Sequence, residues 1–248
     1  AVRHPPPWCE NGRVDKRQAI EAYWSDQAGT FDDEPDHGLA DPHVRAAWAA
    51  RLAEWVPSGA LRVADLGCGT GSVSVLLAES GAEVAGVDLS PAMIEQAERK
   101  AAAAGVAIEF HVGDASDPDL PHGSFDVVLS RHSLWTLEDP VGALSRWARL
   151  HNETGRLVLI EGHWFDPPPP SAGEPRLPWE GGVAATQLMA ARQPIFVRID
   201  HYPLSTEAEL WGKTVTDERY AVVACDPVAR RSADRATGSP PNVPPATS

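Results

Sequence analysis

The sequence predicts an α/β fold, a doubly wound and mostly parallel seven-stranded sheet with an antiparallel edge strand and an N-terminal helical cap. Two observations support this prediction. Short apolar runs alternate with helical patterns through the middle of the chain, as parallel strands joined by covering helices require. Glycines at positions 67, 69 and 71 follow the first of these runs, at the strand-to-helix turn where such sheets bind ligands.

The middle of the chain supplies the parallel part of the sheet. The expected strands are 61–66, 83–88, 107–112, 124–130 and 155–162, and the expected helices are 71–80, 91–104 and about 140–150. Helix-length segments separate most of these strands, and parallel neighbours need such crossovers whereas antiparallel neighbours need only a short turn.

The two flanking regions complete the expected fold. The last third suggests a helix, a strand, a helical turn and a strand at 183–192, 195–200, 207–211 and 219–225. No helix-length crossover separates the last two strands, so we expect them to pair antiparallel at one sheet edge. Large apolar residues recur at helical spacing over 19–27 and 43–56, which we expect to form a cap over the strand ends.

We expect one folded domain with a short tail at each end. The domain covers 14–226, divided into the helical cap (14–60), a cofactor-binding core (61–162), and a substrate segment with the C-terminal strands (163–226). Residues 1–13 and 227–248 offer little apolar surface to bury, so we expect them to be disordered. The Pro-rich stretch 165–182 is either a lid over the substrate or a disordered connection.

Composition narrows the classes of partner. A net charge of -14 counts against a nucleic acid, because binding to phosphates depends on Lys and Arg. No apolar run approaches the ~18 residues of a membrane span, and the first residues lack the apolar centre of a secretory signal, so we expect a cytoplasmic protein. The three cysteines are widely spaced, with no second Cys or His at metal-ligand spacing, so no metal site is expected. A small-molecule partner is expected, and the oligomeric state, including a homodimer, stays open.

The glycine-rich turn distinguishes between two classes of ligand. A dinucleotide and an adenosine with an amino-acid tail both bind at such turns, because glycine has no Cβ to hold a ligand away. The dinucleotide pattern needs glycine at position 72, where this chain has Ser72. Asp65, just before the turn, would repel a pyrophosphate but attract an ammonium group. The turn therefore favours an adenosine with an amino-acid tail.

Carboxylates also follow the next two strands. Asp88 ends the second strand, where it can accept hydrogen bonds from both ribose hydroxyls. Asp114 follows the third strand, where it can accept a hydrogen bond from the exocyclic amine of adenine.

These motifs, DLGCGTG at 65–71, VDLS at 87–90 and GDA at 113–115, resemble the S-adenosylmethionine-binding motifs of class I methyltransferases over about residues 20–162. The resemblance implies S-adenosylmethionine as cofactor and S-adenosylhomocysteine as product. It implies the following contacts: Asp65, Gly67, Cys68, Gly69 and Gly71 with the methionine part, Asp88 and Leu89 with the ribose, Asp114 and Ala115 with the adenine, and Met93 packed on the adenine ring.

The N-terminal region resembles a group of actinobacterial methyltransferases. That group opens with YW-x(6)-FD-x-EPDHGL, here Tyr23, Trp24, Phe31, Asp32 and residues 34–39. We expect Tyr23 and Phe31 to close the methionine end of the pocket. Similar proteins commonly have a Pro-Gly-Gly turn before the fifth strand, whereas this chain has HNETGR at 151–156, which we interpret as a changed turn.

Candidate chemistry lies where the fourth strand ends, in SRHSLWTLEDP. His132 is the first candidate for a general base, with an imidazole tuned near neutrality, and a structural histidine is the alternative. His37 is the second candidate, because the cap would bring it over the pocket. Arg131 is counted with the cofactor contacts, although it could instead bind an acidic substrate or pair with Glu138 or Asp139.

Three further residues are candidates for contact with the substrate. Trp135 either stacks on the substrate or fills the core of the cap. Glu161 ends the fifth strand and His163 lies just beyond it, where both would reach the same pocket mouth. There they could orient a substrate, and the favoured alternative is that both act indirectly, by supporting the residues that contact it.

The function expected from these residues is methyl transfer from S-adenosylmethionine to a small molecule of specialised metabolism, to oxygen or nitrogen in preference to carbon. Two alternatives remain. A nicotinamide-dependent oxidoreductase is disfavoured by Ser72 and Asp65, and a non-catalytic protein that binds S-adenosylmethionine stays open. The DPPP at 166–169 follows the fifth strand and lacks the Tyr of the (N/D)PPY element of adenine methyltransferases, so we treat it as coincidence.

Overall fold

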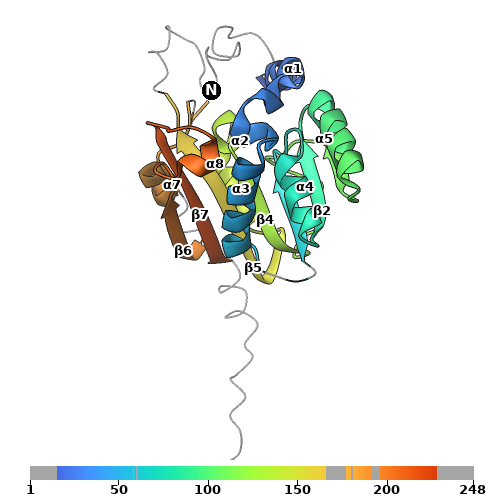
Figure 1. Ribbon diagram of the computed structural model, residues 1–248. Coiled ribbons are helices and arrows are strands. Elements are labelled where there is room, and N and C mark those ends of the chain that lie inside the picture. Colours follow the sequence, from blue (N-terminus) through green and yellow to red (C-terminus); the bar gives the residue numbers. More distant parts are fainter. Residues whose placement is uncertain are drawn as a thin grey trace, which may run out of the picture.

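The computed structural model describes residues 16–57, 59, 61–165, 177–179, 181–191 and 196–227 (Figure 1). The helices are α1 (Lys16–Gln27), α2 (Pro35–Gly38), α3 (Pro42–Trp55), α4 (Ser72–Glu79), α5 (Pro91–Ala104), α6 (Pro140–Trp147), α7 (Ala185–Ala191) and α8 (Ala208–Trp211), with 3-10 turns η2 (Phe31–Asp33) and η3 (Leu134–Thr136). The strands are β1 (Arg62–Leu66), β2 (Glu83–Asp88), β3 (Glu109–Val112), β4 (Phe125–Arg131), β5 (His151–His163), β6 (Phe196–Pro203) and β7 (Glu218–Pro227). Both expected tails, 1–13 and most of 227–248, and most of the Pro-rich stretch lie outside the described residues.

The seven strands form one sheet in the order β3-β2-β1-β4-β5-β7-β6. The pairs from β3 to β5 are parallel, whereas β7 pairs antiparallel with both β5 and β6. The predicted fold class is confirmed, and the reversed strand is β7, one place in from the edge strand β6. Strand order reverses between β1 and β4, so ligands are expected beyond the carboxyl ends of these two strands.

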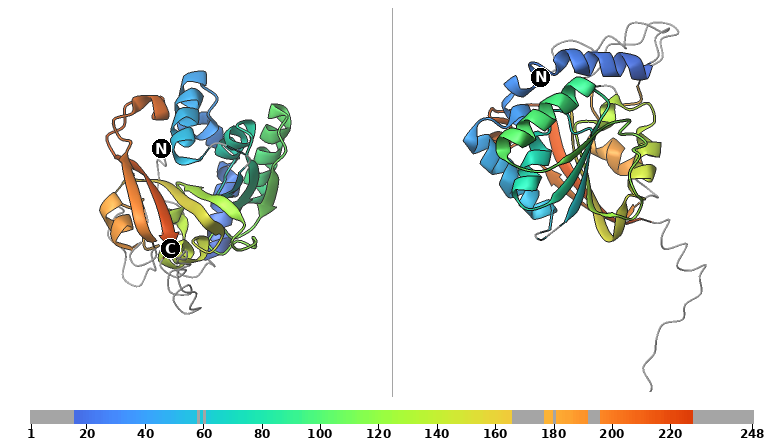
Figure 2. Two further views of the ribbon diagram at one scale, coloured as in Figure 1. Left: turned by 90° about the horizontal axis from the view of Figure 1, so that it is seen from below. Right: turned by 90° about the vertical axis from the view of Figure 1, so that its right-hand side faces the viewer.

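The central strands are largely apolar along their middle because both faces of the sheet are covered. Along β5, Leu157 and Leu159 pack into one buried cluster, and Val158 and Ile160 pack into another on the opposite face. The first cluster includes residues of α6 and α7, and the second includes residues of α3, α4 and α8. The sheet therefore lies between two helical layers (Figures 1 and 2).

The N-terminal helices divide between two roles. Trp48, Leu52 and Trp55 of α3 are buried against Val63 and Val127 on the face of the sheet, so α3 belongs to a covering layer. Among the described N-terminal elements, α1, η2 and α2 lie as a cap beyond the strand ends, and α1 runs across the top of the molecule in the right-hand view of Figure 2. The expected cap therefore ends before α3.

Local signals explain where the key helix α5 begins and ends. The Ser90 hydroxyl accepts a hydrogen bond of 3.2 Å from the main-chain N–H of Met93, and Pro91 stands at the first helical position. Gly105, with φ of 70°, ends the helix in the left-handed conformation. These caps fix Met93 on the turn of helix that follows β2.

The expected changed turn at 151–156 is wrong. Residues 148–150 form the turn instead, and β5 already begins at His151, which pairs with Phe125. A register shift between Phe125 and Val127 accommodates the additional strand residues. No helix of the described residues is long and apolar enough to cross a membrane.

Candidate active site

A pocket of about 840 Å³ opens beyond the carboxyl ends of β1, β2 and β4. Its size falls within the range of ligand sites in proteins, roughly 300–1,000 Å³. The predicted residues that line it are Phe31, His37, Asp65, Gly67, Cys68, Gly69, Asp88, Leu89, Met93, Asp114, Ala115, Arg131, His132 and Trp135. Segments far apart in the sequence therefore meet at the switch point of the sheet.

The glycine-rich turn forms one wall of this pocket. Gly67 and Gly69 have φ of 72° and 55°, a conformation that L side chains rarely adopt. A Cβ on Gly67 would lie 2.6 Å from Cβ of Ser133, whereas a Cβ on Gly69 would meet only Phe31, at 3.5 Å. Gly67 is therefore required by packing, and Gly69 leaves space beside the pocket.

Gly71 does not line the pocket. Its φ is 74°, and a Cβ there would lie 2.8 Å from Cβ of Ala97 in α5. The absence of a side chain at Gly71 thus permits α4 to pack closely against α5, on the side of the turn away from the pocket.

Asp65 and Asp88 place two carboxylates beside the turn. Burial raises the pKa of Asp65 to about 6, although its carboxylate accepts a hydrogen bond from Ser74 Oγ. Burial also raises the pKa of Asp88, against hydrogen bonds from the main-chain N–H groups of Ser90 and Gly69, both 2.9 Å long. A cationic ligand would favour the charged form of both groups.

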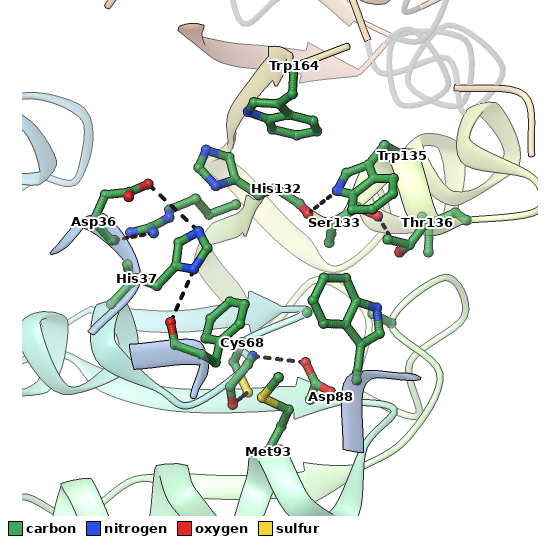
Figure 3. A pocket seen from close by; sticks show the side chains of 18 of the residues that line it. Asp36, His37, Cys68, Asp88, Met93, His132, Ser133, Trp135, Thr136 and Trp164 are labelled. Atoms are coloured by element: carbon green, nitrogen blue, oxygen red, sulfur yellow. Dashed lines mark hydrogen bonds and ion pairs between the residues drawn. The ribbon is translucent and has the colours of Figure 1, made fainter. Parts of the chain in front are cut away.

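The third carboxylate, Asp114, lies where β3 ends. Its Oδ1 accepts a hydrogen bond of 2.8 Å from Ser116 N, and its Oδ2 lies 3.5 Å from Nη1 of Arg17 in α1. Met93 is 1% exposed and lies with Cys68 and Asp88 at the floor of the pocket in Figure 3. Arg17 brings a cap residue to the end of the pocket where Asp114 lies, a contact that the sequence motifs did not indicate.

A polar network ties the cap to the turn. Thr70 Oγ1 donates a hydrogen bond of 2.6 Å to Asp32 Oδ1, and Lys100 Nζ lies 2.8 Å from Asp32 Oδ2. Lys100 also donates to Ser72 Oγ at 2.6 Å. Ser72, which breaks the dinucleotide pattern, therefore helps to hold η2 over the pocket.

Aromatic side chains line the other half of the pocket. Trp135 contacts Trp24 and Trp164 edge to face, with ring centroids 6.1 and 5.8 Å apart. Its indole Nε1 donates a hydrogen bond of 2.8 Å to the carbonyl oxygen of His132, so its polar edge faces the main chain. The half that these rings line is largely apolar.

His132 lies on the aromatic side, in a strained backbone conformation. Its φ is 57°, and its main-chain N–H donates a hydrogen bond of 2.9 Å to the carbonyl oxygen of Ile160. Burial, with the charges of Arg131 and Arg219, holds the pKa of His132 well below its ordinary value. The expected tuning near neutrality is therefore not found, and the imidazole is neutral at physiological pH.

His37 and Asp36 of α2 reach the same region. Nδ1 of His37 lies 3.3 Å from the carbonyl oxygen of Phe31, and its Nε2 lies 3.8 Å from Oδ2 of Asp36. Burial lowers the pKa of His37 to about 4. The ring of His37 stacks on that of Phe31 at 4.3 Å, which connects it to the glycine-rich turn.

Arg131 turns toward the cap. Its guanidinium donates a hydrogen bond to the carbonyl oxygen of Asp36 and lies 4.8 Å from the centroid of a Trp48 ring. The alternative pairing with Asp139 is not found, because Asp139 caps α6 and lies 3.5 Å from Arg146. Nη1 of Arg131 is buried and has no hydrogen-bond partner within the described residues.

Besides Gly71, three predicted residues do not line the pocket, namely Glu161, His163 and Tyr23. Glu161 is buried beneath the loop that follows β4, where Oε1 accepts hydrogen bonds of 3.2 and 3.0 Å from the N–H groups of Ser133 and Leu134. Burial raises the pKa of Glu161 to about 8. His163 lies outside the pocket while the next residue, Trp164, lines it, and Tyr23 lies outside while Trp24 lines it. In both cases the residue that lines the pocket is the next one along the chain from the predicted residue. Consecutive side chains point in different directions along a strand or a helix, so a prediction that is off by one residue selects the wrong side.

Sequence reasoning missed the loop between α8 and β7. The residues from this region that line the pocket are Trp211, Lys213, Thr214, Val215, Thr216, Asp217 and Arg219. Arg219 lies 4.8 Å from the ring centroid of Trp211 and makes hydrogen bonds of 2.6 and 3.0 Å to Asp217. The run of polar residues between the last helix and strand was the available signal.

Comparison with known proteins agrees with this geometry. Residues 64–159 match the family model described as a methyltransferase domain. Aklanonic acid methyltransferase DauC of Streptomyces sp. (strain C5) is 41% identical over 102 residues, 40% of this chain and 46% of that protein. Demethylmenaquinone methyltransferase of Deinococcus radiodurans is 32% identical over 164 residues, 65% of each protein. This chain spans about half the length of the curated relatives that it matches first.

A solved structure extends the likeness in fold. The crystal structure of geranyl diphosphate C-methyltransferase from Streptomyces coelicolor A3(2) matches with a TM-score of 0.62 and 17% identity, over 88% of this chain and 100% of that chain. Identity at this level shows the fold alone. Together the motifs, the strand order and the match identify residues 64–159 as a methyltransferase domain of the class I, Rossmann-like fold.

Proposed function

We propose that this protein transfers a methyl group from S-adenosylmethionine to an oxygen or nitrogen atom of a small-molecule acceptor. One observation carries the proposal: a single pocket joins a glycine-rich turn with three carboxylates to an aromatic half that contains two histidines. The first half suits a cationic nucleoside, and the second suits a largely apolar acceptor. A volume of about 840 Å³ has room for both molecules at once.

The residues of the first half fit S-adenosylmethionine. The open space beside Gly69 lets a ligand approach the main chain, and Asp88 and Asp114 keep acceptor lone pairs for ribose and adenine. The unpartnered Nη1 of Arg131 suits a carboxylate such as that of an amino-acid tail. The raised pKa of Asp65 would fall beside an ammonium group, so binding would favour its ionised form.

Bound S-adenosylmethionine supplies a methyl group on a positively charged sulfur. The protein's own contribution is to place the acceptor atom in line with that carbon, because orientation supplies much of the acceleration of such a transfer. The rings of Trp24, Trp135 and Trp164 exclude water from the place where charge is neutralised.

An O–H or N–H acceptor must also lose a proton. The imidazoles of His132 and His37 line the acceptor half, and their low pKa values leave them neutral, with a lone pair available. A weak base is sufficient late in the transfer, because the acceptor becomes strongly acidic as its new bond forms. We assign His132 as the first proton acceptor and His37 as the second.

The same features support a small acceptor over a nucleic acid. Trp24, Trp135, Trp164 and Trp211 would contact planar or apolar molecules. The net charge of -14 opposes a phosphate backbone. We therefore propose a small, largely apolar acceptor with a hydroxyl or amine.

Calorimetry with S-adenosylmethionine and S-adenosylhomocysteine, followed by a metabolite-extract screen for a mass gain of one methylene, tests the function. Saturable binding of both molecules and one methylated product are expected. Binding without any methylated product would favour the non-catalytic alternative. A change in NADH fluorescence without S-adenosylhomocysteine binding would favour the oxidoreductase.

A further inference from the structure

Three side chains in the acceptor half form a set of metal-ligand atoms. Asp36, His37 and His132 each offer one ligand atom, and these atoms all lie within 4.8 Å of one another. Figure 3 shows the Asp36 carboxylate and the two imidazole rings gathered on one side of the pocket. Two imidazoles with one carboxylate are a common ligand set for divalent transition metals.

The distances leave a space between the three groups. Nε2 of His37 lies 3.8 Å from Oδ2 of Asp36, beyond the length of a hydrogen bond. Ligand atoms around an ion with bonds of about 2.0–2.2 Å lie about 3 to 3.5 Å from one another. Ligand atoms that lie up to 4.8 Å apart would therefore have to approach one another by roughly 1 to 2 Å to reach bonding distance.

Hydrogen bonds with neighbouring groups hold His37 and Asp36 in position, as second hydrogen bonds commonly do for metal ligands. Nδ1 of His37 lies 3.3 Å from the carbonyl oxygen of Phe31, a hydrogen bond that places the proton on Nδ1 and leaves the lone pair of Nε2 facing Asp36. Arg131 donates to the main-chain oxygen of Asp36, so this bond holds the backbone and leaves the carboxylate free. The hydrogen bonds made by His37 Nδ1 and by the main chain of Asp36 thus hold both residues in position while the proposed ligand atoms stay available for an ion.

His132 supplies an independent observation. Its Nε2 is buried and has no hydrogen-bond partner within the described residues. Its backbone is held in the left-handed region, with φ of 57°, by hydrogen bonds to Ile160 and from Trp135. A buried imidazole nitrogen without a partner costs free energy, and an ion between the two rings would satisfy it.

The local charges set a limit on affinity. Arg131 lies close to Asp36 and opposes a cation. Arg219 also faces His132, but its charge is paired with Asp217 at 2.6 Å. Because two neutral nitrogens and one carboxylate are offered, the set suits Zn²⁺, Fe²⁺ or Co²⁺ better than Mg²⁺ or Ca²⁺, which prefer oxygen ligands.

We propose that Asp36, His37 and His132 bind one divalent transition-metal ion on the acceptor side of the pocket. The sequence suggested no metal site, since Asp36 and His37 are neighbours whereas His132 lies about a hundred positions further along the chain, outside any familiar ligand spacing. With an ion bound, both imidazole lone pairs are used as ligands, and the ion would hold an oxygen of the acceptor in place of a free base. This role, unlike the ion site itself, rests on the proposed function.

Cobalt provides the direct test. Full-length protein without an affinity tag is treated with a chelator, desalted and titrated with Co²⁺, with binding followed by visible absorption and calorimetry. One equivalent is expected to bind, and His37→Gln and Asp36→Asn are each expected to weaken binding at least tenfold. His43→Gln, an exposed histidine on α3, is the matched control and should leave Co²⁺ affinity unchanged.

Binding of S-adenosylhomocysteine by each variant distinguishes the loss of a metal ligand from misfolding of the variant. Variants that keep their unfolding temperature and S-adenosylhomocysteine affinity are folded, so their loss of Co²⁺ reports on the ligands. Failure of the wild type to bind Co²⁺, or equal affinity in His37→Gln, would overturn the metal site and leave the proposed function intact. The extract screen, run with chelated and with loaded protein, tests the role: equal turnover would return His132 to a free base.

Discussion

The main-chain N–H of Gly69 donates a hydrogen bond of 2.9 Å to Oδ2 of Asp88, which joins the glycine-rich turn to the end of β2. Oδ1 of the same carboxylate accepts a hydrogen bond of equal length from Ser90 N. Both oxygens are thus held by main-chain groups before any ligand arrives, and each keeps a further lone pair. Pre-organisation of this kind lowers the cost of binding.

Asp88→Ala should therefore weaken S-adenosylmethionine binding more than tenfold, about 1.4 kcal/mol, because it removes the ribose acceptor and releases the turn. Calorimetry measures the effect. Asp119→Ala, an exposed carboxylate beyond β3, is the control and should bind like the wild type. Unchanged affinity in Asp88→Ala would remove this residue from the site.

Two glycines of the turn should respond differently to alanine. Both Gly69 and Gly71 have positive φ, so each substitution carries backbone strain of about 1 kcal/mol. Gly71→Ala also drives a Cβ to 2.8 Å from Ala97, whereas at Gly69 the nearest atom is 3.5 Å away. Urea unfolding should show the larger loss of stability in Gly71→Ala.

Cofactor affinity should rank the two variants in the opposite order, with the larger loss in Gly69→Ala. A Cβ at position 69 enters the space beside the pocket, and one at position 71 does not. Calorimetry should therefore show a greater loss of S-adenosylhomocysteine affinity in Gly69→Ala than in Gly71→Ala, when each loss is compared with the variant's loss of stability. The reverse order would mean that the nucleoside does not approach the main chain at Gly69.

Glu161 should make stability depend on pH. Burial raises its pKa from 4.5 to about 8, so the folded state retains a proton that the unfolded state releases. Its contribution to stability is complete below pH 4.5 and is lost as pH rises toward 8. Glu161→Gln cannot ionise, and its carbonyl oxygen still accepts the hydrogen bonds from Ser133 and Leu134.

The measurement is the free energy of unfolding in urea at pH 5 and pH 8.5, for wild type and Glu161→Gln. Between these values the variant should gain more than about 1.4 kcal/mol relative to the wild type, the equivalent of one pKa unit. The raised pKa of Asp65 acts in both proteins and cancels in the difference. Parallel pH profiles would show that Glu161 is ionised in the folded protein.

His132→Asn should slow methyl transfer at least tenfold while S-adenosylhomocysteine affinity stays within about twofold. Asparagine tolerates the left-handed conformation at φ of 57°, so the loop should keep its shape while the imidazole is lost. Steady-state kinetics with the acceptor found by the screen provides the test. Equal turnover would assign His132 to structure alone.

The confirmed predictions concern residues that lie close together in the sequence. The turn from Asp65 to Gly71 is one strand, one loop and the start of one helix, so its geometry follows from local glycine conformation. Asp88 and Asp114 each end a parallel strand, and such ends meet at one edge of the sheet. The fold class, and the meeting of the glycine-rich turn with these carboxylates at one pocket, were therefore predictable.

The predictions that differ from the structure concern residues whose position depends on the direction of a side chain or on packing between distant segments. Tyr23 and Trp24 are neighbours on one helix, and only packing against Trp135 selects which of them lines the pocket. Glu161 looked like a pocket residue because it lies near the carboxyl end of β5, yet its carboxyl group lies beneath the loop that follows β4 and accepts hydrogen bonds from main-chain N–H groups. Neither direction is encoded in the spacing of apolar residues.

By itself the sequence determined the doubly wound sheet, the switch point and the carboxylates at the ends of the parallel strands, because each depends on short stretches with strong local preferences. Only the tertiary structure decided the acceptor half, where α2, the loop after β4, Trp164 and the loop before β7 converge. The gathering of Asp36, His37 and His132 belongs to that second class. Residues separated by about a hundred positions come within a few ångströms only when burial of α3 against β4 brings α2, which precedes α3, beside the loop that follows β4.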